Sequence, residues 1–524
     1  LAQQSSIQFE DITEGSGIDF IHSDGSSDEP LIQSSVTGGL ATFDFDNDGL
    51  VDILFTSAPR PQSSARDYSN RLYKNLGDWK FQDVTESSGL SSRQFTLGVA
   101  TGDYNNDGYP YIFLNNLGPN ALYVNNGDGT FTELADPVFQ ASGRLGAGAC
   151  LLDVDGDGHL DLWIGNYVNL NARRTIPRFS RGQPTVPGPR DFEADNDQLL
   201  RNNGDGTFSD ITENSGLARR AGTSMGGVAF DFDRDGDTDL FICNDNMENF
   251  LWLNDGTGKF QEVALLIGVA GDSAGSIQGN MGVGCADVNR DGWLDLAVTN
   301  FDSEIPNLYI SASGKYFDDL SARFGLGSAI RDVKWGIVLN DFDNDGFTDL
   351  AMATGHLNPN AVNEGSLLRY ASRNRLYRNV NGQKFVEIIG AEKSGFETVL
   401  ASRGMAADDL DNDGRVDLVI NNFNAPAQIL RNITSNNNHW SMVRLIGTRT
   451  SRSAAGSVVT ILTGSGELVQ EVMRGKGYQS DYGHWIYFGL GQERVESIQV
   501  HWHGGGHSVI SSPQTDSRLT IVQE

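Results

Sequence analysis

A nine-residue pattern, D-x-D-x-D-G-x-x-D, recurs along this chain and constrains its fold more than any other feature. Its copies begin at Asp44, Asp153, Asp231, Asp287, Asp341 and Asp409, and a degenerate copy begins at Asp103. Their first aspartates lie 50 to 78 residues apart, which is the scale of a four-stranded propeller blade with its loops. Repetition at such a period indicates one structural unit used many times.

Each copy has the same flanking sequence. A short apolar stretch precedes it and another follows, as in GGLATF before Asp44 and DILFT from Asp52; both are typical of buried strands bounded by glycine. A third strand follows, such as NRLYKN from Asn70. After a glycine-rich hairpin turn, a fourth strand starts Phe-x-Asp/Glu, as in FQDVT from Phe81. We therefore predict an all-β fold, a seven-bladed β-propeller, over residues 1–434.

The strand count also predicts how the ring closes. One Phe-x-acidic strand, at Phe9, precedes the first loop, and none follows the last loop. We expect the Phe9 strand to complete the last blade, because this pairs edges that would otherwise be bare. Residues 435–524 lack the repeat and follow a polar run, SNNNH, from Ser435. Their short alternating strands predict a small β-sandwich domain.

The loops themselves predict a metal site. Carboxylates at positions 1, 3 and 5 converge if the chain curls, the glycine at position 6 permits that curl, position 7 adds a backbone carbonyl and position 9 adds a carboxylate. Such an oxygen-only set suits Ca²⁺. The alternative is an Asx turn whose side chains cap their own backbone. The candidate ligands are Asp44, Asp46, Asp48, Leu50, Asp52, Asp103, Asn105, Asp107, Asp153, Asp155, Asp157, His159, Asp161, Asp231, Asp233, Asp235, Asp237, Asp239, Asp287, Asn289, Asp291, Trp293, Asp295, Asp341, Asp343, Asp345, Phe347, Asp349, Asp409, Asp411, Asp413, Arg415 and Asp417.

The copies are expected to differ in affinity, with about five to seven Ca²⁺ bound in all. Asn289 removes one charge from its loop, and the loop with Asn105 and Tyr111 is expected to bind most weakly or not at all. Sites with a Kd of about 0.1 mM fill outside cells, where calcium is millimolar. The loops therefore predict an extracellular, cell-surface or periplasmic protein, and we interpret the start at Leu1 as a processed terminus rather than a truncation.

Composition excludes some classes of partner. The net charge is −31, which argues against general electrostatic binding to nucleic acid or to an anionic membrane surface. No apolar run approaches the roughly 18 residues of a transmembrane helix. The three cysteines are too few for a disulfide framework.

The chain resembles a known family at these motifs. The repeats look like the FG-GAP/VCBS repeats of integrin α-subunit propellers and bacterial surface proteins. The C-terminal segments VRLIG from Val443, Arg452, YFGLG from Tyr487 and VHWHGG from Val500 resemble the ASPIC/UnbV domain. Together they are similar to the cartilage acidic protein family and its bacterial relatives. His503 departs from the pattern, because a proline is expected after the tryptophan. The resemblance implies a secreted calcium-binding propeller used in adhesion or recognition.

Other candidate sites lie away from the repeats. The connection 166–195 carries Arg173, Arg174, Arg178, Arg181 and Arg190, which favours either an anion or glycan contact or a loop pinned by salt bridges. Polar groups at strand ends opposite the calcium loops would either form a pocket around the channel or cap strands: Tyr68, Arg144, Asn166, Tyr167, Asp245, Asn246, Asn300, Asp302, Lys334, Trp335, His356 and Arg403.

Histidines give two weaker predictions. His356 is the best single acid–base candidate, although a structural role is the more common one for a lone histidine. His501 and His503 are two apart on an expected strand and would share a face, where they either hold a transition metal or lie exposed.

The functional hypothesis is a non-enzymatic recognition protein whose partner is a protein, a glycan or a second copy of the chain. The alternatives are a carbohydrate-active lyase or hydrolase and a structural subunit of a surface assembly.

Overall fold

The computed structural model describes residues 7–26, 31–60, 69–90, 92–140, 144–173, 179–180, 183–184, 186–357, 369–390 and 395–524. Strands dominate this part of the chain. Its α-helices are single turns of four residues, namely α1 (Ile32–Ser35), α2 (Thr212–Ser215) and α3 (Ala264–Ile267). The described residues therefore contain no long helix.

Seven antiparallel sheets form the main body of the described chain, and each contains a run of four neighbouring strands. The strands follow chain order in six of these sheets, and β1 joins the seventh. Three of them are β2 (Leu40–Phe43), β3 (Asp52–Phe55), β4 (Arg71–Asn75) and β5 (Phe81–Asp83); β6 (Thr96–Gly102), β7 (Tyr111–Asn116), β8 (Ala121–Asn125) and β9 (Phe131–Glu133); and β10 (Arg144–Leu152), β11 (Asp161–Arg173), β15 (Gln198–Asn202) and β16 (Phe208–Asp210), to which β14 (Phe192–Ala194) adds a fifth strand.

The remaining four sheets complete the series. They are β17 (Ser224–Phe230), β18 (Asp239–Asn244), β19 (Phe250–Asn254) and β20 (Phe260–Glu262); β21 (Asn280–Ala286), β22 (Asp295–Asn300), β23 (Asn307–Ser311) and β24 (Phe317–Asp319); β25 (Lys334–Asn340), β26 (Asp349–Thr354), β28 (Arg375–Asn379) and β29 (Phe385–Glu387); and β31 (Ser402–Asp408), β32 (Asp417–Asn422), β33 (Gln428–Asn432) and β1 (Phe9–Asp11). Two short pairs, β12 (Phe179–Ser180) with β13 (Gln183–Pro184) and β27 (Ser372–Arg373) with β30 (Val399–Leu400), lie outside these sheets.

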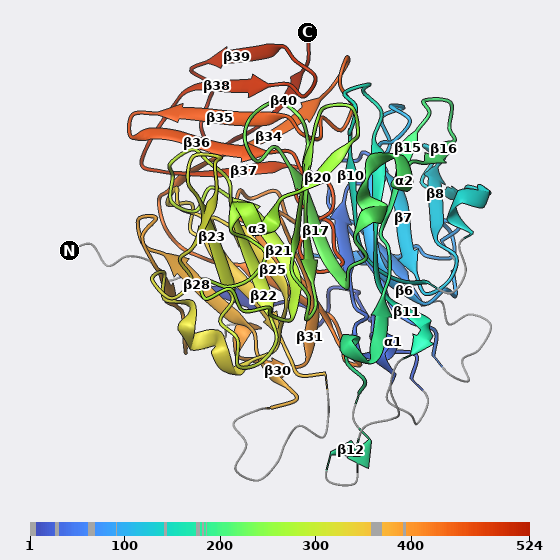
Figure 1. Cartoon of the computed structure of the whole chain (residues 1–524). Coiled ribbons are helices and arrows are strands. Elements are labelled where there is room, and N and C mark those ends of the chain that lie inside the picture. Colours follow the sequence, from blue (N-terminus) through green and yellow to red (C-terminus); the bar gives the residue numbers. More distant parts are fainter. Residues whose placement is uncertain are drawn as a thin grey trace.

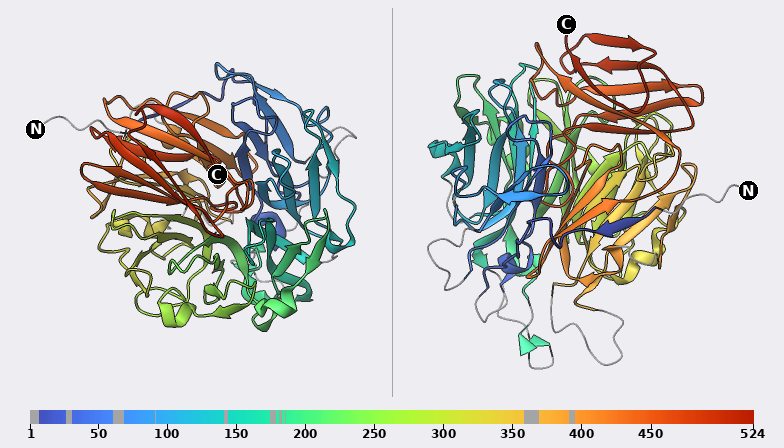
Figure 2. Two further views of the ribbon diagram at one scale, coloured as in Figure 1. Left: turned by 90° about the horizontal axis from the view of Figure 1, so that it is seen from above. Right: turned by 180° about the vertical axis from the view of Figure 1, so that it is seen from behind.

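The sheets close into a ring, seen from above in Figure 2. Each first strand contacts the first strands of its two neighbours, and β31 contacts β2 to complete the circle. The strand from the other end of the chain closes the last sheet, because β1 pairs antiparallel with β33 and Phe9 lies opposite Asn432. The predicted all-β propeller and its closing strand are therefore confirmed.

Glycines let the inner strands approach one another. A Cβ on Gly98 would lie 1.9 Å from the carbonyl oxygen of Ala147, and one on Gly282 would lie 2.5 Å from that of Trp335. The glycines that face a neighbouring inner strand in this way are Gly39, Gly98, Gly148, Gly226, Gly282, Gly336 and Gly404. A side chain at these positions would force the sheets apart, so the small-residue stretches of the sequence set the width of the ring.

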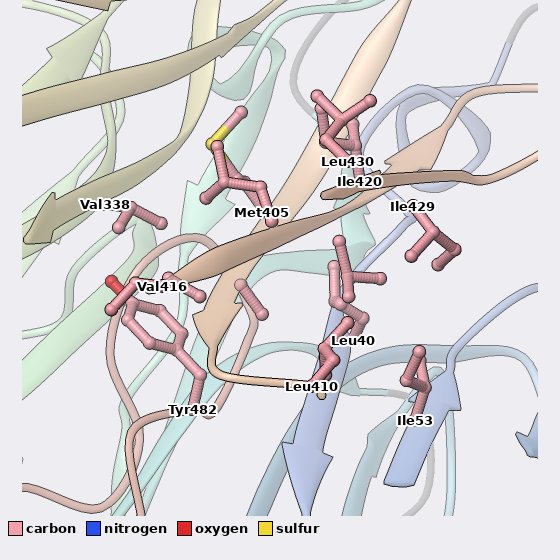
Figure 3. Packing of buried hydrophobic residues seen from close by; sticks show 14 of the residues in the cluster. Leu40, Ile53, Val338, Met405, Leu410, Val416, Ile420, Ile429, Leu430 and Tyr482 are labelled. Carbon is pink, nitrogen blue, oxygen red and sulfur yellow. The ribbon is translucent and has the colours of Figure 1, made fainter. Parts of the chain in front are cut away.

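Apolar side chains fill the space between the sheets. In the largest cluster Leu40 and Ile53 of one sheet meet Met405 and Ile429 of the closing sheet (Figure 3). All four side chains are 0% exposed, and full burial of such a side chain contributes roughly 1.5–3 kcal/mol. The clasp formed by β1 is part of this core, since Phe9 belongs to the same cluster.

The C-terminal domain is a sandwich of two sheets, as predicted. Its strands are β34 (His439–Ile446), β35 (Val458–Thr463), β36 (Gly466–Glu471), β37 (Ile486–Gly491), β38 (Val495–His501), β39 (His507–Ser511) and β40 (Ser517–Val522). One sheet has the order β37-β34-β40 and the other β36-β35-β38-β39. Residues such as Val443, Ile461 and Ile498 form the core between them, and the domain stacks on one face of the ring (Figure 1).

The connection between β36 and β37, residues 472–485, fills the centre of the ring. We call it the plug. It forms β-bridges with Ala41, Leu151 and Val283 from three different sheets. Tyr478 in the plug is 0% exposed, and its hydroxyl donates to the carbonyl oxygen of Val36 at 2.7 Å. The central channel is therefore occupied by this chain's own backbone, a feature that the sequence did not predict.

Candidate metal centres

The seven aspartate loops share one backbone conformation. In the loop from Asp341, this first carboxylate accepts hydrogen bonds from the backbone N–H groups of Asp345 at 3.0 Å and Gly346 at 2.6 Å. The fourth position is left-handed, with φ of 54° at Asn344. Glycine and asparagine adopt that conformation at low cost, which explains why the pattern is rich in both residues.

The last aspartate of the pattern fixes the loop to the third strand of its sheet. Asp52 accepts one hydrogen bond from the N–H of Phe45 at 3.1 Å and another from the N–H of Asn75 at 2.8 Å. The equivalent aspartates with the same two contacts are Asp161, Asp239, Asp295, Asp349 and Asp417. Part of each loop is thus the self-capping turn that was the alternative to a metal site.

Five loops nevertheless bring three carboxylates together. In each, one oxygen per residue lies within 4.8 Å of the others; the groups are Asp44, Asp46 and Asp48; Asp153, Asp155 and Asp161; Asp231, Asp233 and Asp239; Asp341, Asp343 and Asp349; and Asp409, Asp411 and Asp417. These clusters have the geometry to hold metal ions. Within the described residues, the loops from Asp103 and Asp287 form no such group.

Most predicted ligands at position 5 lie outside these groups. Asp157, Asp235, Asp345 and Asp413 each accept a hydrogen bond from the N–H two residues later. These contacts shape the turn, and arginines pair with the second oxygen of two of these carboxylates: Arg378 with Asp345 and Arg415 with Asp413. The backbone carbonyls at position 7 remain predicted ligands.

Unpaired oxygens distinguish the five clusters from the other two loops. Each cluster contains one buried carboxylate oxygen that has no hydrogen-bond partner, and these are the Oδ1 atoms of Asp46, Asp155, Asp231, Asp343 and Asp411. Four of these oxygens belong to position 3, and the fifth, on Asp231, belongs to position 1. In the other two loops an asparagine amide stands at position 3: Asn105 donates to Asp107 at 3.0 Å and Asn289 donates to Asp291 at 2.9 Å. A buried charged oxygen without a partner is costly, and a bound cation would remove that cost.

Burial and mutual repulsion raise the pKa of the clustered acids. Desolvation, reinforced by neighbouring carboxylates, raises the pKa of Asp231 and Asp343 to about 6 and that of Asp409 to about 7. The pKa of Asp239 is raised to about 8 for the same reasons. The clusters are therefore short of positive charge at neutral pH.

Basic side chains from the third strands supply part of that charge in some loops. The Lys74 ammonium lies 3.1 Å from Asp48 and also pairs with Asp46. Arg378 pairs with Asp343 at 2.8 Å and Arg431 with Asp411 at 3.2 Å. The loop from Asp231 has no such partner from its third strand, because Leu253 occupies the equivalent position.

The C-terminal domain contributes a different side chain to each of several loops. Arg452 lies 3.9 Å from Asp103, and His503 lies 3.9 Å from Asp153. Buried Glu471 accepts a hydrogen bond from the N–H of Asp231 at 3.2 Å. The ring face that carries the loops is thus covered by this domain. Sequence reasoning missed these contacts because the partners are more than 200 residues apart.

The polar groups predicted around the channel on the opposite face are mostly engaged with one another. Arg403 is 0% exposed, and its guanidinium lies 4.1 Å from the centre of the Trp335 ring. The Lys334 ammonium donates to the carbonyl oxygens of Phe301 at 2.9 Å and Glu304 at 2.6 Å. These residues pack and cap strand ends rather than line a solvent pocket. Tyr68 lies outside the described residues.

Two further predicted sites have different outcomes. The ring centre of His356 lies 5.7 Å from that of Phe301, and burial lowers the pKa of His356. Neither observation tests catalysis, and a catalytic role for His356 stays a prediction. Of the five arginines in the 166–195 connection, Arg174, Arg178 and Arg181 lie outside the described residues. Arg173 is the last residue of β11, and Arg190 lies in a short 3₁₀ helix, Pro189–Asp191.

The prediction that His501 and His503 share one face of a strand is wrong. Strand β38 ends at His501, which is exposed and lies opposite His507. His503 follows in the turn and is buried against the propeller, with only 8% of its surface exposed. The alternation of a strand does not extend past its last residue, so the two rings point to different surroundings.

The fold and its repeated acidic loops define a β-propeller built from repeats that carry candidate metal sites. A family model described as an FG-GAP-like repeat matches residues 44–114, 103–164, 191–242, 231–298 and 341–420. A second, described as ASPIC and UnbV, matches residues 447–524. The chain belongs to the FG-GAP-like repeat family and carries an ASPIC and UnbV domain.

Its curated relatives include cartilage acidic protein 1. The human protein is 28% identical over 504 residues, covering 89% of this chain and 69% of the relative. The Xenopus tropicalis protein is 27% identical, covering 89% of this chain and 70% of the relative. A solved structure of an Agrocybe aegerita lectin that recognises non-reducing terminal N-acetylglucosamine aligns with a TM-score of 0.40 and 18% identity, over 69% of this chain and 82% of that one. Among the described residues, no helix is both long and apolar enough to cross a membrane.

Proposed function

We propose that this protein is a calcium-binding propeller that acts in adhesion or recognition outside the cytoplasm. The observation that carries the calcium proposal is the set of five carboxylate clusters, each with one buried oxygen that lacks a partner. Oxygen-only clusters of this kind suit a hard divalent cation, and calcium accepts irregular sets of six to eight oxygens. The ions would be about five to seven, held by the predicted loop residues.

The residues present would supply the ligands without rearranging the turns. The carboxylates at positions 1 and 9 are already fixed by backbone N–H groups, as Asp341 and Asp349 show. The carboxylate at position 3, Asp343 in this loop, has the free oxygen. An ion would neutralise like charges that burial now holds together. It would thereby link strands one and two of each sheet.

A location outside the cytoplasm follows from the affinity expected of such sites. Loops with a Kd of about 0.1 mM are occupied at millimolar calcium and are mostly empty at the calcium levels of the cytosol.

The partner is proposed to be a protein, a glycan or a second copy of the chain. The C-terminal domain covers the loop face of the ring, as its contacts with Asp103, Asp153 and Asp409 show. The opposite face carries the variable connections, and variable loops on a rigid scaffold are common places for binding sites. We therefore assign recognition to that face.

Calcium-dependent stability tests the proposal. Metal-free protein should gain several degrees of melting temperature in 1 mM calcium, because each site of 0.1 mM affinity adds about 1.4 kcal/mol to the free energy of unfolding. Metal analysis of the same sample should find five to seven calcium equivalents. Equal melting temperatures in chelator and in calcium, with no metal bound, would reduce the loops to simple turns.

A further inference from the structure

His503 occupies an unusual position between the two domains. It follows β38, its side chain is 5% exposed, and its Nε2 lies 3.9 Å from Oδ2 of Asp153. In the described part of the chain, this Nε2 is buried and has no hydrogen-bond partner. A buried ring nitrogen normally has a donor or acceptor beside it. The nearest acidic group belongs to the cluster of Asp153, Asp155 and Asp161.

The backbone around the ring is shaped to hold it there. The N–H of His503 donates to the hydroxyl of Ser457 at 3.0 Å, which fixes the start of the turn. A Cβ on Gly456 would lie 2.8 Å from Nδ1 of the ring, so a glycine is needed for the imidazole to pack at this point. Gly456 also has φ of +79°, a conformation that favours glycine. The ring is therefore held in place by the sandwich domain while its free nitrogen faces the propeller.

We propose that His503 is a ligand from the C-terminal domain to the metal ion held by the loop from Asp153, and that this mixed site prefers a Zn²⁺-like cation to calcium. The inference rests on the proposed function, because it requires that loop to hold an ion. Two donors at 2.0–2.1 Å from one zinc ion are at most about 4.2 Å apart. The distance of 3.9 Å between Nε2 and Asp153 Oδ2 lies within that limit.

The donor set explains the expected selectivity. Calcium takes oxygen ligands almost exclusively, whereas imidazole with carboxylates suits zinc and other first-row cations. Asp155 supplies the carboxylate of this mixed donor set, because its Oδ1 is buried and has no hydrogen-bond partner. In all five clusters the grouped donors are carboxylates, and the contact between His503 and Asp153 brings an imidazole nitrogen beside this one cluster among the ion pairs of the described residues. This loop would then join propeller and sandwich through one ion, which a calcium loop on a single sheet does not do.

Zinc binding in the presence of calcium tests the proposal. The full chain with His501→Gln, which removes the exposed pair of His501 and His507, is dialysed against 2 mM calcium and increasing zinc. We expect one zinc equivalent that calcium does not displace. Adding His503→Gln should weaken it at least tenfold, and adding Asp155→Asn instead should do the same. Equal zinc affinity with and without His503 would overturn the inference.

A second measurement detects the imidazole ligand directly. The wild-type chain loaded with Mn²⁺ should show a ¹⁴N coupling from imidazole in pulsed electron paramagnetic resonance. The coupling should persist in His501→Gln and disappear in His503→Gln. Calcium bound at the loops without any ¹⁴N coupling would refute the His503 ligand and leave the proposed function standing. Absence of calcium from every loop would instead refute the proposed function.

Discussion

The five loops with an aspartate at every acidic position and the two loops with an asparagine share one turn but differ in what they leave unsatisfied. The Asp341 and Asp287 loops form the same hydrogen bonds from positions 5 and 6 to position 1. Only the loop from Asp341 keeps a buried carboxylate oxygen without a partner, on Asp343. In the other, Asn289 donates to Asp291 and closes the network.

The comparison separates the turn from the metal site. Backbone hydrogen bonds to positions 1, 5 and 9 form the turn whether or not a cation is present. Position 3 takes little part in the turn and decides the charge at its centre. One amide nitrogen in place of a carboxylate oxygen supplies a donor where an ion would otherwise be needed. The sequence left open whether each loop is a metal site or an Asx turn. Positions 1, 5 and 9 form the turn, whereas position 3 decides whether the loop can be a metal site.

The largest expected effect is on the pH dependence of stability. Burial and neighbouring acids raise the pKa of Asp409 to about 7 and that of Asp239 to about 8, whereas an unfolded chain has values near 3.9. The metal-free folded protein thus binds more protons than the unfolded chain. Its free energy of unfolding should fall by a few kcal/mol between pH 4 and pH 8.

Calcium should flatten that dependence, because the ion replaces the protons. Urea unfolding of metal-free and calcium-loaded protein at pH 5, 6, 7 and 8 measures both slopes. Parallel slopes in the two series would show that the clustered carboxylates hold no ion.

A substitution in the most acidic loop should remove one site. The loop from Asp231 carries five aspartates and lacks a basic residue on its third strand, so we expect it to bind most tightly. Asp231→Asn should lower the calcium-dependent part of the free energy of unfolding by about 1.4 kcal/mol at a tenfold excess of calcium over Kd. Asp103→Asn is the matched control in an asparagine loop. An equal loss from both variants would contradict the division of the loops.

The converse substitution should create a site. Asn289→Asp restores the carboxylate at position 3 and removes the amide that now donates to Asp291. We expect up to one further calcium equivalent by metal analysis, with an affinity gain of about tenfold, or 1.4 kcal/mol. Asn105→Asp should gain less, because the Tyr111 hydroxyl already donates to Asp107 at 2.7 Å. An unchanged calcium count in Asn289→Asp would show that position 3 does not decide binding.

The smallest effect is expected from removing the lysine ammonium that pairs with the loop from Asp44. Lys74→Met removes the ammonium that pairs with Asp46 and Asp48. Calcium affinity at that loop should rise by up to about fivefold, since exposed and half-exposed ion pairs are worth about 1 kcal/mol or less. Isothermal titration measures it, with Lys80→Met as control because the Lys80 ammonium donates to the carbonyl of Gly15 and not to a loop carboxylate among the described hydrogen bonds. Weaker calcium binding in Lys74→Met would mean that the lysine supports the site.

Much of the fold was predictable because its signals are local and repeated. The apolar stretches on either side of loops such as those from Asp44 and Asp409 predict sheets of four strands. The strand at Phe9, which precedes the first loop, predicts the closing pair, in which Phe9 lies opposite Asn432. Counting strands against loops in the sequence shows that the last sheet lacks a fourth strand and that the strand at Phe9 is left over to fill that place. The positions of His501 and His503 were not predictable in the same way, because the point where β38 ends depends on packing against the propeller.

The sequence by itself determined the repeated unit, the turn of each loop and the difference between aspartate and asparagine copies. These depend on hydrogen bonds within nine residues and on strand alternation, which the local sequence contains. Tertiary structure alone decided that the plug fills the ring, that the sandwich covers the loops and that His503 meets Asp153. Those contacts join residues hundreds of positions apart, and only the closed ring brings their backbones within reach.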